Sequence, residues 1–142
     1  MNNKRIIQLF FTILIFGLLS SCSNTTDKDK KNNVIQSNVK TTNLKFNNKY
    51  VNFGKLSVDT LVTARFDFKN TGSNPLIIYH VNPDCSCTDF YLSNDSVNPG
   101  DSAYIELVLN TEGKFGYQKI YAVVEANTKA KLYKLTLEAD IQ

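Results

Sequence analysis

From Leu44 to the end of the chain, apolar and polar side chains alternate, and this period of two is the feature that most constrains the fold. In the segment 60–70 every second residue is apolar, and the residues between them are mostly polar or charged. The apolar positions are Val62, Ala64, Phe66 and Phe68. Such alternation is typical of a β-strand that buries one face. Because no helical period extends beyond one or two turns here, the sequence predicts an all-β domain at 44–142.

Further segments have the length and composition of strands, and turn sequences separate them. They cover residues 44–46, 50–53, 76–81, 88–92, 103–109, 119–125 and 133–141. The segment 76–81 is apolar on both faces, so we expect it to be a central strand. Residues 98–101 read Asn-Pro-Gly-Asp, which predicts a type II turn. Gly72 lies in another turn sequence, where we expect the positive φ that glycine adopts at little cost. A polar hairpin loop is expected at 126–131.

Seven to eight strands in one domain of this size predict an immunoglobulin-like antiparallel β-sandwich. The sequence has no Trp and no widely spaced pair of cysteines within the domain. Sandwiches of the chaperone or fibronectin kind are therefore a better match than antibody domains. A small closed barrel is the alternative fold.

Residues 1–21 have the pattern of a secretion signal. Lys4 and Arg5 precede an apolar run at 6–19, which is shorter than the roughly 18 to 20 residues that a transmembrane helix needs. The ending Leu19-Ser20-Ser21-Cys22 resembles the lipobox of bacterial lipoproteins. This resemblance implies cleavage before Cys22 and lipid on its sulfur, so the membrane is the first expected partner. By analogy with enteric lipoproteins, Ser23 in place of Asp indicates the outer membrane of the cell envelope.

Residues 22–43 are expected to be a flexible linker behind the lipidated cysteine. After Cys22 this segment has no aromatic residue, no Gly and no Pro, and it buries too little apolar surface to offset the entropy of ordering. Loss of Lys4 and Arg5 with the signal lowers the formal net charge from +3 to +1. With so small a charge and no basic stripe, we expect no nucleic-acid partner.

The domain also carries a series of short motifs in a recognisable order. They are Asn52-Phe53-Gly54, Phe66-x-Phe68-x-Asn70-Thr71-Gly72, Pro75-Leu76-Ile77-Ile78, Cys85-x-Cys87-Thr88 and Asn98-Pro99-Gly100-Asp101. The combination resembles the bacterial family called domain of unknown function 1573, which is common in Bacteroidetes lipoproteins. The resemblance implies an immunoglobulin-like sandwich in the envelope and brings no established activity. The family usually has Gly between the cysteines, where this chain has Ser86.

Cys85 and Cys87 are the residues of the domain that invite chemistry, and three interpretations stay open. In an extended strand their Cα atoms would lie about 6.7 Å apart, at the far end of the range for a disulfide. A turn at 82–84 would bring them closer, and a disulfide in so small a ring would be readily reduced. Alternatively, the two thiolates and His80 could bind Cu(I) or Zn²⁺. The third interpretation is two small residues packed at a strand end.

No catalytic motif accompanies these residues. The chain lacks a Gly-x-Ser-x-Gly elbow, a P-loop and a dinucleotide fingerprint, and His80 is its one histidine. We therefore expect a protein that is not an enzyme and has no cofactor and no small-molecule substrate. The first hypothesis is an interaction module that binds an envelope protein or glycan through exposed strand edges and exposed tyrosines. The candidate tyrosines are Tyr79, Tyr91, Tyr104, Tyr121 and Tyr133. The second is a metal-handling or thiol-redox protein that acts through Cys85 and Cys87.

Overall fold

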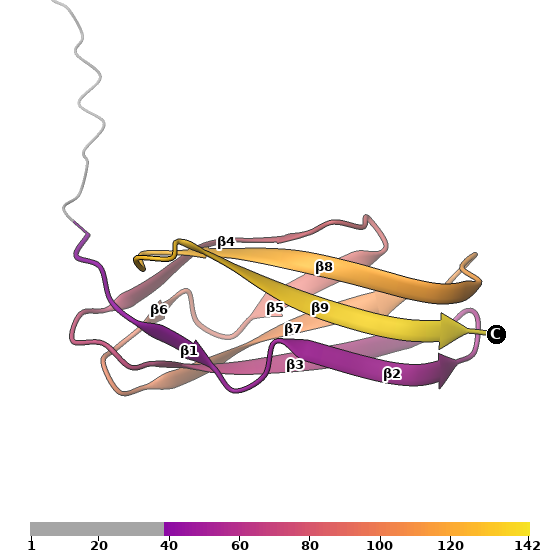
Figure 1. Ribbon diagram of the computed structural model, residues 1–142, viewed down its shortest axis with the longest axis horizontal. Helices are drawn as coiled ribbons and strands as arrows, with labels where there is room; N and C mark the ends of the chain where they lie inside the picture. Colours follow the sequence, from indigo (N-terminus) through magenta and orange to yellow (C-terminus); the bar gives the residue numbers. More distant parts are fainter. Residues whose placement is uncertain (1–38) are drawn as a thin grey trace, which may run out of the picture. The chain divides into compact units, whose positions relative to one another are not determined.

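The computed structural model describes residues 39–142 as two β-sheets packed face to face (Figure 1). The strands are β1 (Leu44–Phe46), β2 (Tyr50–Leu56), β3 (Leu61–Asn70), β4 (Leu76–Pro83), β5 (Thr88–Leu92), β6 (Ser96–Val97), β7 (Ser102–Asn110), β8 (Gly116–Ala126) and β9 (Leu132–Ile141). One sheet has the order β1-β3-β7-β5 and the other the order β2-β9-β8-β4-β6. The predicted signal, Cys22 and the linker up to residue 38 lie outside the described residues. In the part that is described, no helix is long and apolar enough to cross a membrane.

The structure confirms the all-β immunoglobulin-like sandwich, with two differences in detail. It has nine strands rather than seven or eight, because β6 adds a two-residue strand. In addition, β2 pairs with β9 in parallel, whereas the other strand pairs are antiparallel. After β1 the chain crosses to the other sheet and forms β2 without reversing its direction. β2 therefore runs in the same direction as its neighbour β9 (Figure 1).

The core lies between the sheets and follows the predicted alternation. Ala64, Phe66 and Phe68 of β3 are buried against Ile105, Leu107 and Leu109 of β7 and the apolar side of β9. The buried apolar residues of β9 are Leu135, Leu137, Ala139 and Ile141. Full burial of one large apolar side chain contributes about 1.5–3 kcal/mol, so these alternating residues supply the main driving force for the sandwich.

β4 is a central strand only at its start, which corrects the expectation for residues 76–81. It pairs with β8 from Ile78 to Pro83, and β6 covers only Leu76 and Ile77 on the other side. A bulge follows Ile78, and both Tyr79 and His80 are exposed. Pro83 at the end of β4 is consistent with an edge, because proline lacks the N–H that an inner strand would use.

The two predicted turns behave differently. At Asn98–Asp101 the N–H of Asp101 donates to Asn98 O at 3.0 Å and Gly100 has φ +86°, which confirms the type II turn. Gly72, in contrast, is not among the residues with positive φ. A Cβ atom there would collide with the Thr42 hydroxyl and lie 2.6 Å from Asn43 N. Gly72 is thus needed for the close approach of the N-terminal segment, and the expectation of positive φ was wrong.

The last residues of the predicted linker pack on the domain. Thr42 is buried, its N–H donates to Asn127 O at 3.0 Å, and its hydroxyl donates to Asn70 Oδ1 at 2.9 Å. Asn70 is fully buried, and its side-chain N–H groups donate to the carbonyl oxygens of Asn74 and Val97. The ordered contacts of the sandwich therefore reach back before residue 44.

The β8–β9 loop is also more than a polar loop. Asn127 is buried, and its side-chain nitrogen donates to the carbonyl oxygens of Lys40 and Pro75, each at 2.9 Å. Its side-chain oxygen accepts a hydrogen bond from Ile77 N at 2.7 Å. Asn127 thereby joins the entering chain to the start of β4. The described chain enters the sandwich at its left end in Figure 1.

Candidate functional site

The two cysteines lie in the turn that carries the chain from β4 in one sheet to β5 in the other. Cys85 and Cys87 form a disulfide with their Cα atoms 5.1 Å apart. A hydrogen bond from Thr88 N to Cys85 O, 3.1 Å long, closes the turn and brings the two residues within disulfide range. Ser86 is not among the non-glycine residues with positive φ, so a side chain fits where the family usually has glycine.

Hydrogen bonds fix this turn to both sheets. On one side, Asp84 N donates to Tyr121 O and Tyr121 N donates to Asp84 Oδ1, each at 2.9 Å. On the other, Asn110 N donates to Cys87 O at 2.9 Å. The path of the backbone through the turn therefore has anchors that are independent of the disulfide.

The environments of the two sulfur atoms differ. Both cysteines are half-buried and pack against the core. Cys85 Sγ accepts a hydrogen bond of 3.2 Å from the backbone N–H of Cys87, and Cys87 Sγ accepts a longer one of 3.6 Å from the Thr88 hydroxyl. The hydrogen bond to Cys85 Sγ is shorter and comes from a backbone N–H that the turn holds in place, so negative charge is better stabilised on Cys85 than on Cys87.

His80 does not join the cysteines. It is exposed on β4, and no hydrogen bond of its side chain is found within residues 39–142. In the same range, no three His, Cys, Asp or Glu side chains lie close enough together to hold a metal ion. The arrangement therefore lacks the third ligand on which the metal hypothesis depended, and the two sulfur atoms bond to each other.

A hollow runs along the side of the sandwich where β4 and β5 are both uncovered. Its lining residues are Ile78, Tyr79, His80, Val81, Phe90, Leu92 and Asp95. Phe90 is on the core side of β5, in phase with the buried Thr88 and the half-buried Leu92. Phe90 is nevertheless 47% exposed, because the described chain puts no strand beyond β5. The hollow therefore offers an inward-facing aromatic ring that lacks a cover.

The backbone of β5 is also available along this side. Alternate residues of an antiparallel strand direct their N–H and C=O groups to opposite neighbours. At the two ends of β5, Cys87 O accepts a bond from β7 at 2.9 Å and Ser93 N donates one to β7 at 3.0 Å. The intervening Phe90 and Leu92 are out of phase with these residues. Their backbone groups therefore point to the free edge of the sheet.

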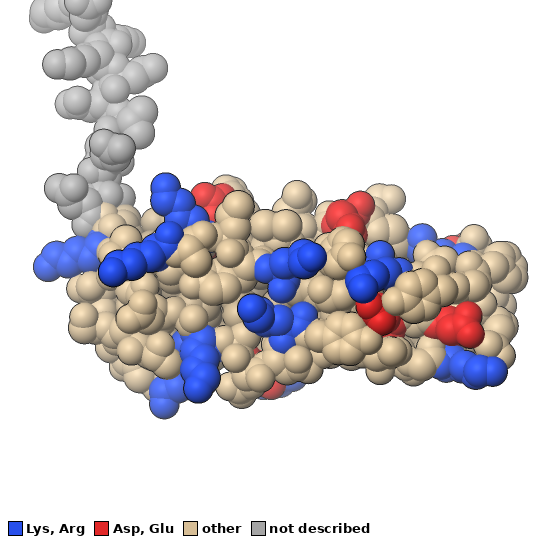
Figure 2. Space-filling model, viewed as in Figure 1, with Lys and Arg blue, Asp and Glu red and all other residues tan. Residues whose placement is uncertain are grey.

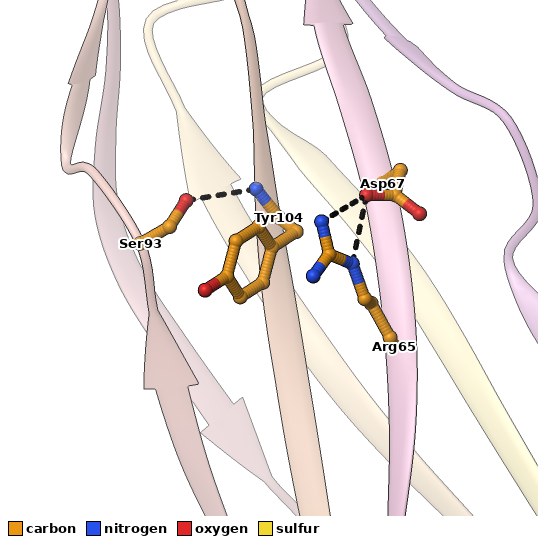
Figure 3. A network of polar contacts seen from close by, with 4 residues as sticks. All are labelled: Arg65, Asp67, Ser93 and Tyr104. Carbon is orange, nitrogen blue, oxygen red and sulfur yellow. Dashed lines mark hydrogen bonds and ion pairs between the residues drawn. The ribbon is translucent and has the colours of Figure 1, made fainter.

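The outer face of the four-stranded sheet carries a compact polar and aromatic network (Figure 3). The guanidinium of Arg65 lies 3.6 Å from the centre of the Tyr104 ring and forms an ion pair with Asp67 at 3.0 Å. Ser93 Oγ accepts a hydrogen bond from Tyr104 N at 2.9 Å. The Tyr91 ring packs on Tyr104 with the ring centres 6.1 Å apart. These contacts hold the side chains of this face to one another, and Arg65, Asp67 and Tyr91 stay about half exposed.

The outer face of the five-stranded sheet has a second cluster, centred on a buried carboxylate. Glu138 is 9% exposed. Its carboxylate accepts a hydrogen bond from the Tyr50 hydroxyl at 2.7 Å and forms an ion pair with Lys119 Nζ at 2.7 Å. Hydrogen bonds from Lys119, Tyr50 and Tyr117 lower the pKa of Glu138 to about 2.

The Lys and Arg side chains on the side seen in Figure 2 are separated by other residues and do not merge into a basic stripe.

Sequence reasoning had singled out the cysteines and a set of tyrosines, and the structure distinguishes among them. Tyr79 and Tyr91 are exposed, whereas Tyr104, Tyr121 and Tyr133 are half-buried. Phe90, Tyr50 and Tyr117 were not predicted as functional residues. The pattern Thr-x-Phe-x-Leu at 88–92 does place Phe90 on the core side. It carries no signal that β5 is an edge strand.

The two stacked sheets and their strand order define an immunoglobulin-like β-sandwich domain. The chain belongs to the family of proteins of unknown function DUF1573, which matches residues 44–141. No curated protein matches the sequence.

Several solved structures share this fold. A protein of unknown function from Porphyromonas gingivalis W83 is similar with a TM-score of 0.64 and 18% identity, over 72% of this chain and 48% of that one. This chain thus spans about half the length of the Porphyromonas protein. The PapD-like domain 7 of human CEP192 has a TM-score of 0.55 and 12% identity, over 72% of this chain and 87% of that one. The secreted serine protease VesC from Vibrio cholerae is similar with a TM-score of 0.54 and 13% identity, over 70% of this chain and 23% of that one. At these identities the likeness concerns the fold alone.

Proposed function

We propose that this protein is a lipid-anchored, non-enzymatic interaction module of the cell envelope that binds an extended segment of another envelope protein. The observation that carries the proposal is Phe90, a core-facing ring that is 47% exposed beside a free strand edge. A partner strand next to β5 would cover this ring and add a strand to the four-stranded sheet. Strand addition of this kind takes affinity from main-chain hydrogen bonds and specificity from pockets for alternate side chains.

The hollow supports the same partner chemistry. Phe90 and Leu92 supply both the unpaired backbone groups and an apolar lining, and Tyr79 extends that lining across to β4. An extended segment with apolar residues at alternate positions would bond to the backbone and fill the hollow with the same strand. A glycan could stack on exposed rings but would leave the backbone of β5 unpaired, so a peptide partner fits this side better.

The proposed anchor is compatible with this binding edge. The signal-like residues 1–21 and Cys22 support attachment to the envelope membrane by lipid, with the outer membrane as the proposed location. The described chain enters the sandwich beside Asn127 and Ile77, and the turn after Pro83 lies toward the other end (Figure 1). From Ile77 to Pro83 the strand extends roughly 20 Å. The free edge of β5 would then be presented away from the anchored end.

Co-purification of the full-length protein from solubilised membranes tests the proposal. We expect a stoichiometric partner with the wild type, and at least about a tenfold loss of it with Phe90→Lys, because a charge at a strand edge prevents pairing. Phe115→Lys is the matched control, since Phe115 is 73% exposed and does not line the hollow. Equal recovery with Phe90→Lys, or no partner in repeated experiments, would contradict the proposal. Recovery of a glycan that depends on Tyr117 would favour the glycan alternative.

A further inference from the structure

The Cys85–Cys87 disulfide contributes little to holding the turn. Its loop contains a single residue between the cysteines, and closing so short a loop removes little entropy from the unfolded chain. Hydrogen bonds from Asn110 N to Cys87 O and from Asp84 N to Tyr121 O fix the turn to both sheets. Because the turn has these other anchors, the sulfur atoms can change their bonding without loss of the fold.

The disulfide is also accessible. Cys85 and Cys87 are half-buried, and the neighbouring residues Asp84, Ser86 and Asp89 are exposed. The turn joins two strands that lack an outer neighbour over most of their length. A thiolate of another molecule can therefore approach the sulfur atoms from solvent.

The hydrogen bonding distinguishes the two sulfur atoms as leaving groups. The backbone N–H of Cys87 donates to Cys85 Sγ at 3.2 Å, whereas Cys87 Sγ has only the longer bond of 3.6 Å from the rotatable Thr88 hydroxyl, so negative charge is better stabilised on Cys85 Sγ when the S–S bond breaks. The sulfur that leaves as the more stable thiolate leaves faster in thiol–disulfide exchange. An incoming thiolate is therefore directed to Cys87 Sγ, and Cys85 is released.

We propose that Cys85–Cys87 is a thiol–disulfide exchange site that takes two electrons from a dithiol of another envelope protein. The first thiolate of that dithiol attacks Cys87 Sγ, so a mixed disulfide forms and Cys85 leaves as a thiolate. The second thiolate of the dithiol then attacks the sulfur that the first thiolate brought into the mixed disulfide, and Cys87 leaves as a thiolate. The dithiol becomes a disulfide, the Cys85–Cys87 bond is reduced, and the two thiol protons pass to Cys85 and Cys87. This activity goes beyond the proposed binding function and does not require the β5 edge.

The purified full-length protein in detergent, with small thiols as probes, provides the test. We expect millimolar dithiothreitol to release two thiols per chain while the circular dichroism of the β-sheet stays unchanged. Brief treatment with reduced glutathione, followed by iodoacetamide, should leave glutathione on Cys87 and the alkyl group on Cys85 in about tenfold excess over the reverse. Peptide mass mapping reads out both positions.

Single variants give an independent measurement of the same asymmetry. With Cys87→Ser, the N–H of residue 87 still reaches Cys85 Sγ, so Cys85 should react with iodoacetamide at a lower pH than Cys87 does in Cys85→Ser. A disulfide that resists dithiothreitol until the domain unfolds would overturn the proposal. Equal labelling of the two sulfur atoms would overturn the assigned order of attack. Neither result depends on whether a partner binds at β5, so failure here is separate from failure of the proposed function.

Discussion

At residue 72 the constraint on the side chain comes from a neighbouring segment rather than from the turn itself. A Cβ atom at Gly72 would collide with the Thr42 hydroxyl and the backbone of Asn43. Thr42 is 30 residues away in the chain, so the collision has no local sequence signal. The turn residues around Gly72 suggested positive φ, which was a reasonable expectation for glycine but the wrong reason for its presence.

We predict that Gly72→Ala destabilises the domain by about 1–3 kcal/mol, because overpacking forces the backbone at 42–43 to move. Unfolding in urea, followed by tyrosine fluorescence, measures this difference. Ser73→Ala is the control, since Ser73 is exposed in the same turn and should change the free energy of unfolding by less than about 0.5 kcal/mol. A Gly72→Ala protein as stable as the control would contradict the close contact.

The buried carboxylate of Glu138 is a second feature that depends on distant residues. Tyr50 is 88 residues away in the chain, and Lys119 reaches Glu138 only because β8 and β9 pair in the observed register. The pKa of Glu138 falls from 4.5 to about 2 in the folded protein. The ionised form is thus favoured by folding. The resulting stabilisation is complete above the unfolded pKa and is lost as the pH falls toward about 2.

This sign gives a prediction for the pH dependence of stability. The melting temperature of the wild type should exceed that of Glu138→Gln at neutral pH. The difference in melting temperature should shrink from about pH 5 to pH 2, because the wild type loses the charge of Glu138 in that range and Glu138→Gln has no such charge to lose. Thermal melts at a series of pH values measure this difference. A difference that stays constant or widens on acidification would show that the Lys119 and Tyr50 contacts do not stabilise the carboxylate.

At the scale of elements, the sequence predicted which face of each strand is buried, but it did not predict which strands lie side by side. Alternation at 60–70 and 133–141 correctly identified which side chains enter the core, since burial of one face imposes a period of two. Nothing in that period specifies which strand lies beside which. The sequence therefore suggested a central strand at 76–81, whereas β6 covers only the start of β4. The exposed edge of β5 follows from the same strand order.

The β4–β5 turn is the element on which the chemistry depends, and we predict that it folds without its disulfide. In the chain-entropy description a loop of this size contributes only about 1–2 kcal/mol. The Cys85→Ser/Cys87→Ser double variant should therefore lose no more than this amount in urea unfolding and keep the circular dichroism of the wild type. Failure of the double variant to fold would mean that the disulfide, rather than the bonds to β7 and β8, holds the turn.

At the scale of the whole molecule, the composition and the ordered motifs were sufficient for the class of fold and for the family. The period of two, the turn sequences and the motifs around Asn70 and Cys85 all fall within the range 44–141 that the family covers. The proposed binding edge could not be predicted, because it arises from incomplete coverage of one side of the sandwich. That property belongs to the arrangement of nine strands and is not encoded in any one of them.

The central claim is that the β5 edge binds an extended segment of an envelope protein. The most direct measurement is photo-crosslinking in living cells, with p-benzoylphenylalanine in place of Phe90 in the full-length protein. The account predicts a discrete crosslinked protein at position 90, and none when the same group replaces Phe115 or Tyr117. Crosslinks at position 117 with none at position 90 would contradict the account and place the contact on the outer face of the five-stranded sheet.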